Sequence, residues 1–255
     1  MARIDVNCDM GESFGVYEIG GDEEALLELV SSANVACGFH AGDPRIIDRT
    51  VGLAARHHVA VGAHPSHHDL RGFGRREVKA SPEEVEADVV YQVGAVLAFA
   101  RAHEVPLVHV KPHGALYNQA VTDESLARAI ARGIRRVSPD LIFVGLATSK
   151  AMREAAAAEG LRYAGEAFAD RVYNPDGTLQ SRRIAGSVIT DPGKAARQAV
   201  EIATGHRVTA HDGTVVRLDA ETLCLHGDNE AALENARAVR RALEDEGVEI
   251  KGLSA

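Results

Sequence analysis

Three stretches decide the fold: HVAVGAH at residues 58–64, SPEEVEADVVYQVGAVLAFARAH at residues 81–103 and LVHVK at residues 107–111. The first and third are short runs rich in valine, bounded by polar residues, which is typical of buried strands. The long middle stretch has apolar residues at helical spacing. A strand, a helix and a second strand in this order predict a unit in which two parallel strands are joined by a covering helix.

The start of the middle stretch carries strong helix signals. Ser81 can accept a hydrogen bond from the backbone three residues on, Pro82 suits the first helical position, and Glu84 can close a capping box. One face of the helix is then apolar at a period near 3.6 residues, formed by Val85, Val89, Val93 and Val96. This stripe predicts a helix packed against a sheet.

The same alternation continues along the whole chain. Predicted strands are Arg3–Asp9, Ser32–Phe39, His58–His64, Leu107–Lys111, Leu141–Leu146, Leu161–Glu166 and Leu223–His226, with Ser187–Thr190 as a weaker eighth. Predicted helices lie near Asp22–Val30, Pro44–Arg56, Pro82–His103, Asp123–Val137, Ser149–Glu159, Pro192–Thr204 and Glu230–Glu246, and 205–220 resembles a hairpin. No linker divides the chain, so residues 1–255 are expected to form one domain. Its length favours a closed parallel (β/α) barrel over an open sheet.

Composition narrows the possible functions. The chain carries 28 basic and 37 acidic residues, a formal charge of −9, and has no tryptophan. It therefore lacks the basic footprint of a nucleic-acid-binding protein. No apolar run is long enough for a membrane span and no signal peptide is evident, so we expect a cytoplasmic protein. The three cysteines have no paired spacing and are expected to be buried free thiols.

Polar residues follow several predicted strands at the point where each strand ends. In a parallel barrel these ends meet at one mouth, where active sites are found. The residues are Asp9, Glu12, His40, His64, Lys111, His113, Glu166, Asp170, Arg171, His226 and Asp228. Their convergence predicts a polar pocket suited to small-molecule chemistry.

The first strand adds a detail about the barrel interior. Asp5, Asn7 and Asp9 alternate and are expected to share one face of the strand. His109 lies two residues before Lys111 and is expected to point to the same face, as a hydrogen-bonded histidine of the interior. The position of His109 predicts a polar side chain inside the barrel.

Two cofactor questions follow from these residues. A divalent metal could be held by His40, His64 or His113 together with Asp9, since three nitrogen or oxygen ligands and an open position form a hydrolytic centre. The spacing does not decide for or against such a site. No glycine-rich phosphate loop is present, so any ATP is not bound by that motif.

Six segments also resemble, in order, the signature segments of the LamB/YcsF family of 5-oxoprolinase A subunits. They are DVNCDMGESFG (5–15), NVACGFHAGDP (34–44), VGAHPSHHDLRGFGRR (61–76), HVKPHGALYN (109–118), GEAFADRVYNPDGTLQSR (165–182) and LCLHGDN (223–229). The resemblance runs from about residue 4 to about residue 247. It implies a barrel of the glycoside hydrolase/deacetylase type with about seven strands.

The resemblance also implies an activity. Members act with two partner subunits to hydrolyse 5-oxoproline to glutamate at the expense of ATP, which is expected to bind mainly with those partners. The catalytic candidates are then Asp9, His40, His64 and His113, and the substrate-binding candidates are Glu12, Lys111, Glu166, Asp170, Arg171, His226 and Asp228. Asp9 or His113 would be the general base, while Lys111 and Arg171 would hold the anionic groups. Two alternatives stay open: a metal-dependent amide or carbohydrate deacetylase, and a barrel that binds a small molecule without turnover.

Overall fold

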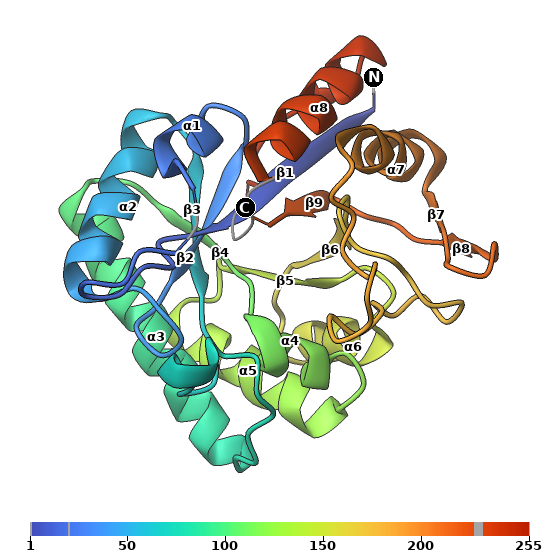
Figure 1. Ribbon diagram of the computed structural model, residues 1–255. Coiled ribbons are helices and arrows are strands. Elements are labelled where there is room, and N and C mark those ends of the chain that lie inside the picture. Colours follow the sequence, from blue (N-terminus) through green and yellow to red (C-terminus); the bar gives the residue numbers. More distant parts are fainter. Residues whose placement is uncertain (1, 20, 227–231, 255) are drawn as a thin grey trace.

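A computed structural model describes residues 2–19, 21–226 and 232–254 of the chain. Within them, seven parallel strands close into a barrel in the order β1-β2-β3-β4-β5-β6-β9, and β9 pairs back with β1 (Figure 1). The barrel strands are β1 (Arg3–Met10), β2 (Ser32–Ala36), β3 (Ala60–His64), β4 (Leu107–Val110), β5 (Ile142–Leu146), β6 (Tyr163–Phe168) and β9 (Thr222–Leu225). The predicted closed barrel of about seven strands is confirmed.

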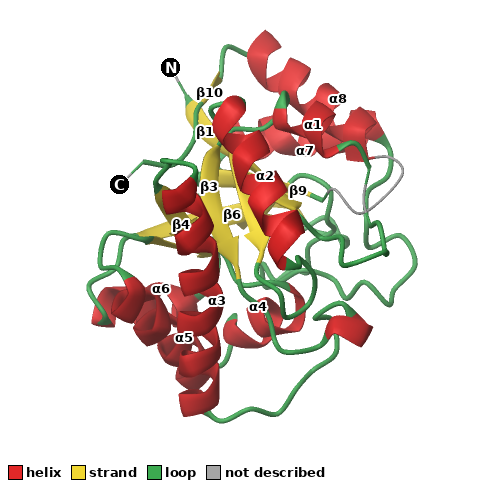
Figure 2. Ribbon diagram, turned by 90° about the vertical axis from the view of Figure 1, so that its left-hand side faces the viewer, coloured by secondary structure: helices red, strands yellow, loops and turns green. Residues whose placement is uncertain are grey.

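Helices surround the barrel and leave one end for the connecting loops (Figure 2). They are α1 (Glu23–Leu27), α2 (Pro44–Arg56), α3 (Pro82–Ala102), α4 (Gly114–Ala120), α5 (Glu124–Val137), α6 (Lys150–Ala158), α7 (Pro192–Gly205) and α8 (Ala232–Asp245). Within the described ranges, none of these helices combines the length and the apolar character of a membrane span.

The capping signals of α3 are realised in the structure. The Ser81 hydroxyl accepts from the Glu84 amide at 3.2 Å, and the Glu84 carboxylate accepts from the Ser81 amide at 2.7 Å. The predicted valine stripe is buried. Burial of such a stripe is the main source of helix stability, because it removes apolar surface from water.

The barrel interior is polar near its axis, and the larger apolar core lies between the strands and the helices. Asp5, Asn7 and Asp9 of β1 share one face, as predicted, and this face points inward, where they hydrogen-bond to neighbouring strands. His109 is buried and its Nε2 lies 2.7 Å from Asn34 Oδ1, which confirms its interior position. An interior lined with such groups is stable only because each finds a partner.

Some elements differ from the prediction. Ser187–Thr190 does not form a strand; only Val188 makes an isolated bridge, to Arg171, because this segment is an irregular loop held by backbone bonds. The short α4 and a small strand β10 (Glu249–Ile250), which pairs with the start of β1, were not predicted. The hairpin is confirmed as β7 (Arg207–Thr209) and β8 (Val215–Arg217). The predicted start of the last helix lies outside the described residues.

Candidate active site

The predicted residues come together at the barrel mouth. Asp9 and Glu12 lie at and after the end of β1, His40 follows β2, and His64 ends β3. Beyond the ends of the other strands lie Lys111, His113, Asp170, Arg171 and His226, while Glu166 is within β6. All ten are wholly or largely buried. Asp228 lies outside the described residues.

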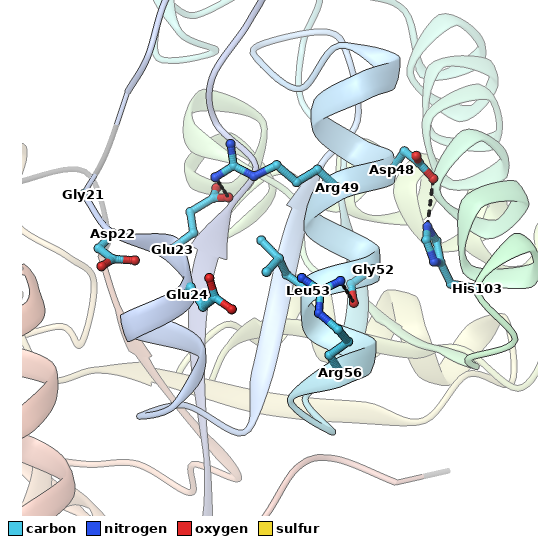
Figure 3. Close-up of a pocket in the computed structure, with 10 residues that line it drawn as sticks. All are labelled: Gly21, Asp22, Glu23, Glu24, Asp48, Arg49, Gly52, Leu53, Arg56 and His103. Carbon is cyan, nitrogen blue, oxygen red and sulfur yellow. Dashed lines mark hydrogen bonds and ion pairs between the residues drawn. The ribbon is translucent and has the colours of Figure 1, made fainter.

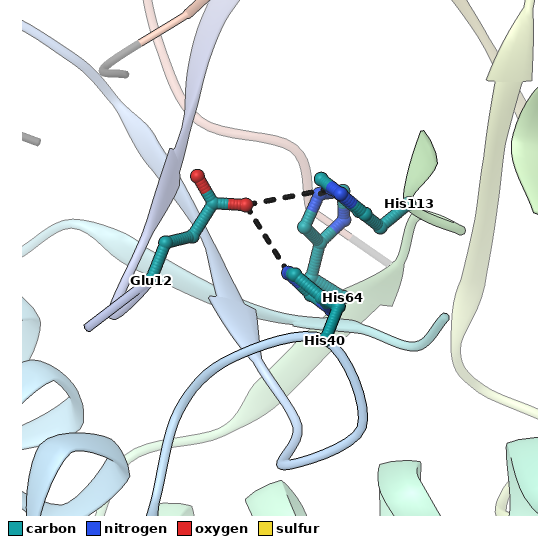
Figure 4. Close-up of side chains that lie close together, drawn as sticks. All are labelled: Glu12, His40, His64 and His113. Atoms are coloured by element: carbon teal, nitrogen blue, oxygen red, sulfur yellow. Dashed lines mark hydrogen bonds and ion pairs between the residues drawn. The ribbon is translucent and has the colours of Figure 1, made fainter. Parts of the chain in front are cut away.

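Glu12, His40, His64 and His113 form one compact group, which we call the histidine cluster (Figure 4). Its ligand atoms all lie within 4.8 Å of one another. Glu12 Oε1 is 3.1 Å from His40 Nε2 and 3.4 Å from His113 Nδ1, and the rings of His40 and His113 stack with centroids 3.8 Å apart. Four donor atoms from four separate segments of the chain therefore point at one position.

The hydrogen-bond partners of His64 and His113 show what must lie at that position. His64 Nδ1 lies 2.6 Å from the Lys111 carbonyl and His113 Nε2 lies 2.9 Å from the Phe73 carbonyl. A carbonyl only accepts, so both of these nitrogens carry hydrogen. In neutral rings the remaining nitrogens, His64 Nε2 and His113 Nδ1, present lone pairs to each other at 2.9 Å. A cation, either a proton or a metal ion, is needed between them.

The donor set fits a metal ion. Burial and then the neighbouring His40 and His64 hold the pKa of His113 well below its ordinary value, which disfavours a proton on that ring. Histidines that bind metals usually donate their other ring N–H to a carbonyl or carboxylate, as His64 and His113 do. Three imidazoles and a carboxylate suit zinc and related transition metals. The histidine cluster can therefore hold a divalent metal.

A tightly built loop supports this cluster. Gln92 of α3 accepts from the Ser66 amide and donates to the Ser66 carbonyl, both at 2.9 Å. Asp69 accepts from the Gly72 amide and from the Arg76 guanidinium. The loop thereby presents the Phe73 carbonyl to His113. Gly74 follows with φ of 64° and packs directly on the histidines.

Beside the histidine cluster, Lys111 is enclosed by two carboxylates and a thiol. Its Nζ lies 2.9 Å from Asp9 Oδ1, 2.9 Å from Glu166 Oε1 and 3.0 Å from Cys224 Sγ. Burial alone would lower the pKa of Lys111, but the carboxylates, above all Asp9, hold it well above its ordinary value. Asp9, Cys224 and His226 could also form a metal-ligand group, but the Lys111 ammonium already supplies the positive charge there.

Asp9 connects the histidine cluster with the residues around Lys111. Its Oδ2 lies 3.2 Å from His64 Nε2, while its Oδ1 accepts from Lys111 and from Asn34 at 2.9 Å. Burial would raise the pKa of Asp9, but His64 and Lys111 outweigh it and hold the pKa well below its ordinary value. Asp9 is therefore a carboxylate at neutral pH.

Glu166 and Asp170, which the sequence predicts to bind substrate, lie behind residues that line the pocket, and their contact with substrate stays a prediction. Glu166 is completely buried beneath Lys111, and Asp170 accepts at 3.0 Å from the backbone amide of His226 and lies 2.9 Å from its ring nitrogen. Neither lines the small pocket of about 50 Å³ at the mouth. They hold Lys111 and His226 in position, whereas those two residues line the pocket with Asp9, His64, His113 and Arg171.

The pocket also has lining residues that the sequence interpretation missed. They include Arg75, Tyr117, Asn118, Phe168, Leu179 and Arg182. Arg75 and Arg182 lie at or next to the ends of two of the six signature segments, but nothing in the local spacing connects them. Both line the pocket because the loops after β3 and β6 fold over the mouth.

A different hollow lies on the side of the barrel, lined by residues of α1 and α2 and by His103 (Figure 3). Its charged groups largely pair with each other: Arg49 with Glu23 at 3.6 Å and His103 with Asp48 at 2.8 Å. None of the ten predicted site residues that the structure describes lines it. The barrel mouth is therefore the candidate active site.

Comparison with known proteins agrees with this geometry. The model of the LamB/YcsF family matches residues 4–255. The chain belongs to the LamB/YcsF family. A relative from Natranaerobius thermophilus, named as the A subunit of 5-oxoprolinase, is 51% identical over 253 residues, which covers 99% of this chain and 98% of the relative.

Solved structures extend the comparison of this LamB/YcsF member. The crystal structure of a lactam utilization protein from Thermus thermophilus matches with a TM-score of 0.93 and 49% identity, covering 98% of this chain and 100% of that chain. The catalytic domain of a peptidoglycan N-acetylglucosamine deacetylase from Eubacterium rectale matches with a TM-score of 0.53 and 11% identity, covering 100% and 89%. The second likeness concerns the fold alone.

Proposed function

We propose that this chain is the lactam-hydrolysing subunit of an ATP-dependent 5-oxoprolinase, which converts 5-oxoproline to L-glutamate. The observation that carries the proposal is full-length similarity, at 51% identity, to a protein named as the A subunit of 5-oxoprolinase, joined to a buried, charged pocket at the barrel mouth. In the net reaction a water adds to the ring carbonyl carbon, the carbon–nitrogen bond breaks and the ring nitrogen takes up a proton.

We assign the general base to Asp9 rather than His113. Both line the pocket, but the two ring nitrogens of His113 face protein atoms: Nε2 faces the Phe73 carbonyl, and Nδ1 faces His64 and Glu12. Asp9 is the one carboxylate among the described residues that line the pocket, and its oxygens have further lone pairs for a water. Proton transfer by a positioned side chain contributes roughly 10²–10⁴-fold to a rate.

The charged residues of the pocket then bind the substrate. Lys111 and Arg171 both line it, and 5-oxoproline carries a carboxylate and a polar lactam carbonyl. An ammonium facing the carbonyl oxygen stabilises the negative charge that develops there during water attack. Glu166 and Asp170 act as positioning residues, because they touch Lys111 and His226 rather than the pocket.

The histidine cluster is the proposed site of a divalent metal, held by Glu12, His40, His64 and His113. Bound there, such an ion would polarise a carbonyl or acidify a water. This donor set also favours a second candidate function, a metal-dependent amide hydrolase resembling deacetylases. The two candidates differ in substrate: the second predicts hydrolysis of N-acetyl groups by the chain alone, without ATP.

We propose that two partner subunits supply the ATP-dependent step. An unactivated lactam is a poor electrophile. Transfer of the γ-phosphoryl group of ATP to its oxygen, with release of ADP, would make the carbon easier to attack; after water addition and ring opening, a second water releases the phosphoryl group as inorganic phosphate. The sequence lacks a phosphate loop, so this step is assigned to the partners, in the cytoplasm where ATP is available. The test measures glutamate formation by the chain alone and with both partners. Turnover only in the complete mixture supports the proposal, and full turnover by the chain alone contradicts it.

A further inference from the structure

A second cavity opens beside the catalytic pocket. It is a groove of about 890 Å³ between the loop after β3, helix α4 and the loop after β6. The groove and the pocket share Arg75, Asn118, Arg171, Leu179 and Arg182 in their linings. A ligand lying in the groove can therefore place one end against Asp9 and Lys111 in the pocket.

The groove is strongly basic for this molecule. Arg75, Arg171, Arg182 and Arg183 line it, against one acidic residue, Glu77, among its described lining residues. The chain as a whole has a charge of −9, so this concentration of arginines departs from its average. Guanidinium groups bind phosphate and carboxylate through paired, directional hydrogen bonds.

The positive charge of Arg171 lies in an environment that is energetically unfavourable for it. It is only 5% exposed, yet its hydrogen bonds among the described residues go to the backbone carbonyls of Gln180 and Ser187, not to a carboxylate. Burial and then the charge of Arg182 lower its pKa to about 10. A buried guanidinium repelled by a second, half-buried guanidinium beside an active site favours a ligand of opposite charge.

Arg171 also organises the loop that carries the other arginines. Its side chain bonds to Gln180 and Ser187 span the segment that contains Arg182 and Arg183. Arg75 approaches from the opposite wall, where its guanidinium lies 4.9 Å from the centre of the Phe73 ring. Phe73 is the residue whose carbonyl holds His113, so the groove and the histidine cluster share a wall.

We propose that Arg75, Arg171, Arg182 and Arg183 form a binding groove for a phosphoryl group attached to the substrate or to a nucleotide. The inference rests on the proposed function and deepens it, because a lactam activated on its oxygen carries both a phosphoryl group and a carboxylate. In the pocket, Arg171 can take the carboxylate, while Lys111 faces the lactam oxygen that carries the phosphoryl group. The groove arginines then take the phosphoryl end, which lies outside a pocket of about 50 Å³.

Inorganic phosphate is the first probe, titrated into the isolated full chain and followed by calorimetry. We expect saturable binding that weakens about tenfold in Arg182→Gln and in Arg183→Gln, the loss of roughly one charge-assisted contact. Arg128→Gln is the matched control, since Arg128 is an exposed arginine of α5 outside the groove. Thermal melting of each variant verifies that it is folded. Unchanged binding in both groove variants, an equal loss in Arg128→Gln, or no phosphate binding at all would overturn the proposal.

ATP and adenosine are the second and third probes and separate the two sources of the phosphoryl group. If ATP binds no more tightly than phosphate, the result supports a phosphorylated lactam as the ligand of the groove. ATP binding that is much tighter, competes with phosphate and depends on Arg182 supports the groove with a nucleotide as its ligand. Adenosine that binds as tightly as ATP, unaffected by the arginine variants, contradicts a phosphoryl site.

The reconstituted complex makes failure of this inference distinguishable from failure of the proposed function. If glutamate forms normally but phosphate binding is the same in all variants, the proposed phosphoryl-binding role of the groove is contradicted and the proposed 5-oxoprolinase function is supported. If phosphate binding depends on Arg182 but no glutamate forms with the partners, the role of the groove is supported and the proposed function is contradicted. If both proposals are correct, Arg182→Gln raises the KM of the complex more than Arg128→Gln does.

Discussion

Gly74 lies so close to His113 that a Cβ atom on the glycine would be 2.8 Å from His113 Cδ2. The same atom would be 2.9 Å from His40 Cβ and would clash with the Ser66 hydroxyl. The backbone here has φ of 64°, which side chains other than glycine rarely adopt. Gly74 is thus the contact through which the loop after β3 sets the position of two cluster histidines.

Gly74→Ala should therefore damage the site as well as the backbone. We expect a loss of turnover of about tenfold or more, since small misplacements of catalytic groups are costly. Gly160→Ala is a matched control, because Gly160 has φ of 66° but nothing within 4 Å of its Cβ position. That control should lose about 1 kcal/mol of stability from backbone strain and keep its activity. Equal turnover in the two variants would show that Gly74 does not position the histidines.

The histidine cluster predicts a bound metal. Protein purified without chelator should contain about one divalent ion per chain, measured by elemental analysis. Glu12→Gln and His40→Ala should lower the content sharply, because each removes one of four ligands. His211→Gln, an exposed histidine of the β7–β8 turn, is the control. Wild-type protein with only trace metal would show that the cation between His64 and His113 is a proton.

Asp9→Asn tests the general base. The amide keeps the size of the side chain and can still accept from Lys111, but it cannot take a proton from water. We expect turnover with the partners to fall by roughly 10²-fold or more, with the protein still folded by thermal melting. Near-normal turnover in a stable variant would remove Asp9 from the catalytic residues and return the role to His113.

Lys111→Met tests the buried charge network. It leaves Asp9 and Glu166 without their shared cation, and breaking a buried pair in this way costs about 3–5 kcal/mol. Urea denaturation should show this loss. Adding Glu166→Gln should recover part of it without restoring turnover, because one uncompensated carboxylate is then removed. Additive losses in the double variant would contradict a direct Lys111–Glu166 interaction.

Acid should loosen the loop that supports His113. Arg76, and also the Gly72 amide, hold the pKa of Asp69 below its ordinary value of 3.8. Because the folded-state pKa is the lower one, this contribution to stability is complete above about 3.8 and is lost as pH falls through the folded-state pKa. Denaturation curves between neutral pH and pH 3 should show it. Asp69→Asn should be less stable at neutral pH and lose less on acidification; parallel curves would contradict the assignment.

Much of this molecule is predictable from local patterns. The valine stripe, the cap at Ser81 and the alternation of strands and helices depend on neighbours in sequence, and they predicted the barrel. The ends of parallel strands meet by topology, so Asp9, His64 and Lys111 could be placed at one mouth without coordinates. The shared face of Asp5, Asn7 and Asp9 on β1 followed from the twofold period of a strand.

The remaining features depend on distances between segments far apart in the chain. His64 and His113 present lone pairs to each other. This arrangement can be inferred only once it is known which carbonyl each ring contacts. The groove arginines lie in loops without periodicity, where side chains such as Arg171 satisfy the backbone. The predicted strand at Ser187–Thr190 is wrong because the backbone groups of this segment form hydrogen bonds within the loop after β6.

The short strand β10 has a consequence for how the chain can be cut and rejoined. Arg3 pairs with Glu249 and Ile4 with Ile250, at the end of β1 away from the mouth. Segments close to the two ends of the described chain therefore lie side by side, at the end of the barrel away from Asp9. A short peptide could join them, and new termini could be opened at the exposed β7–β8 turn, which would give a circular permutant with an undisturbed catalytic pocket.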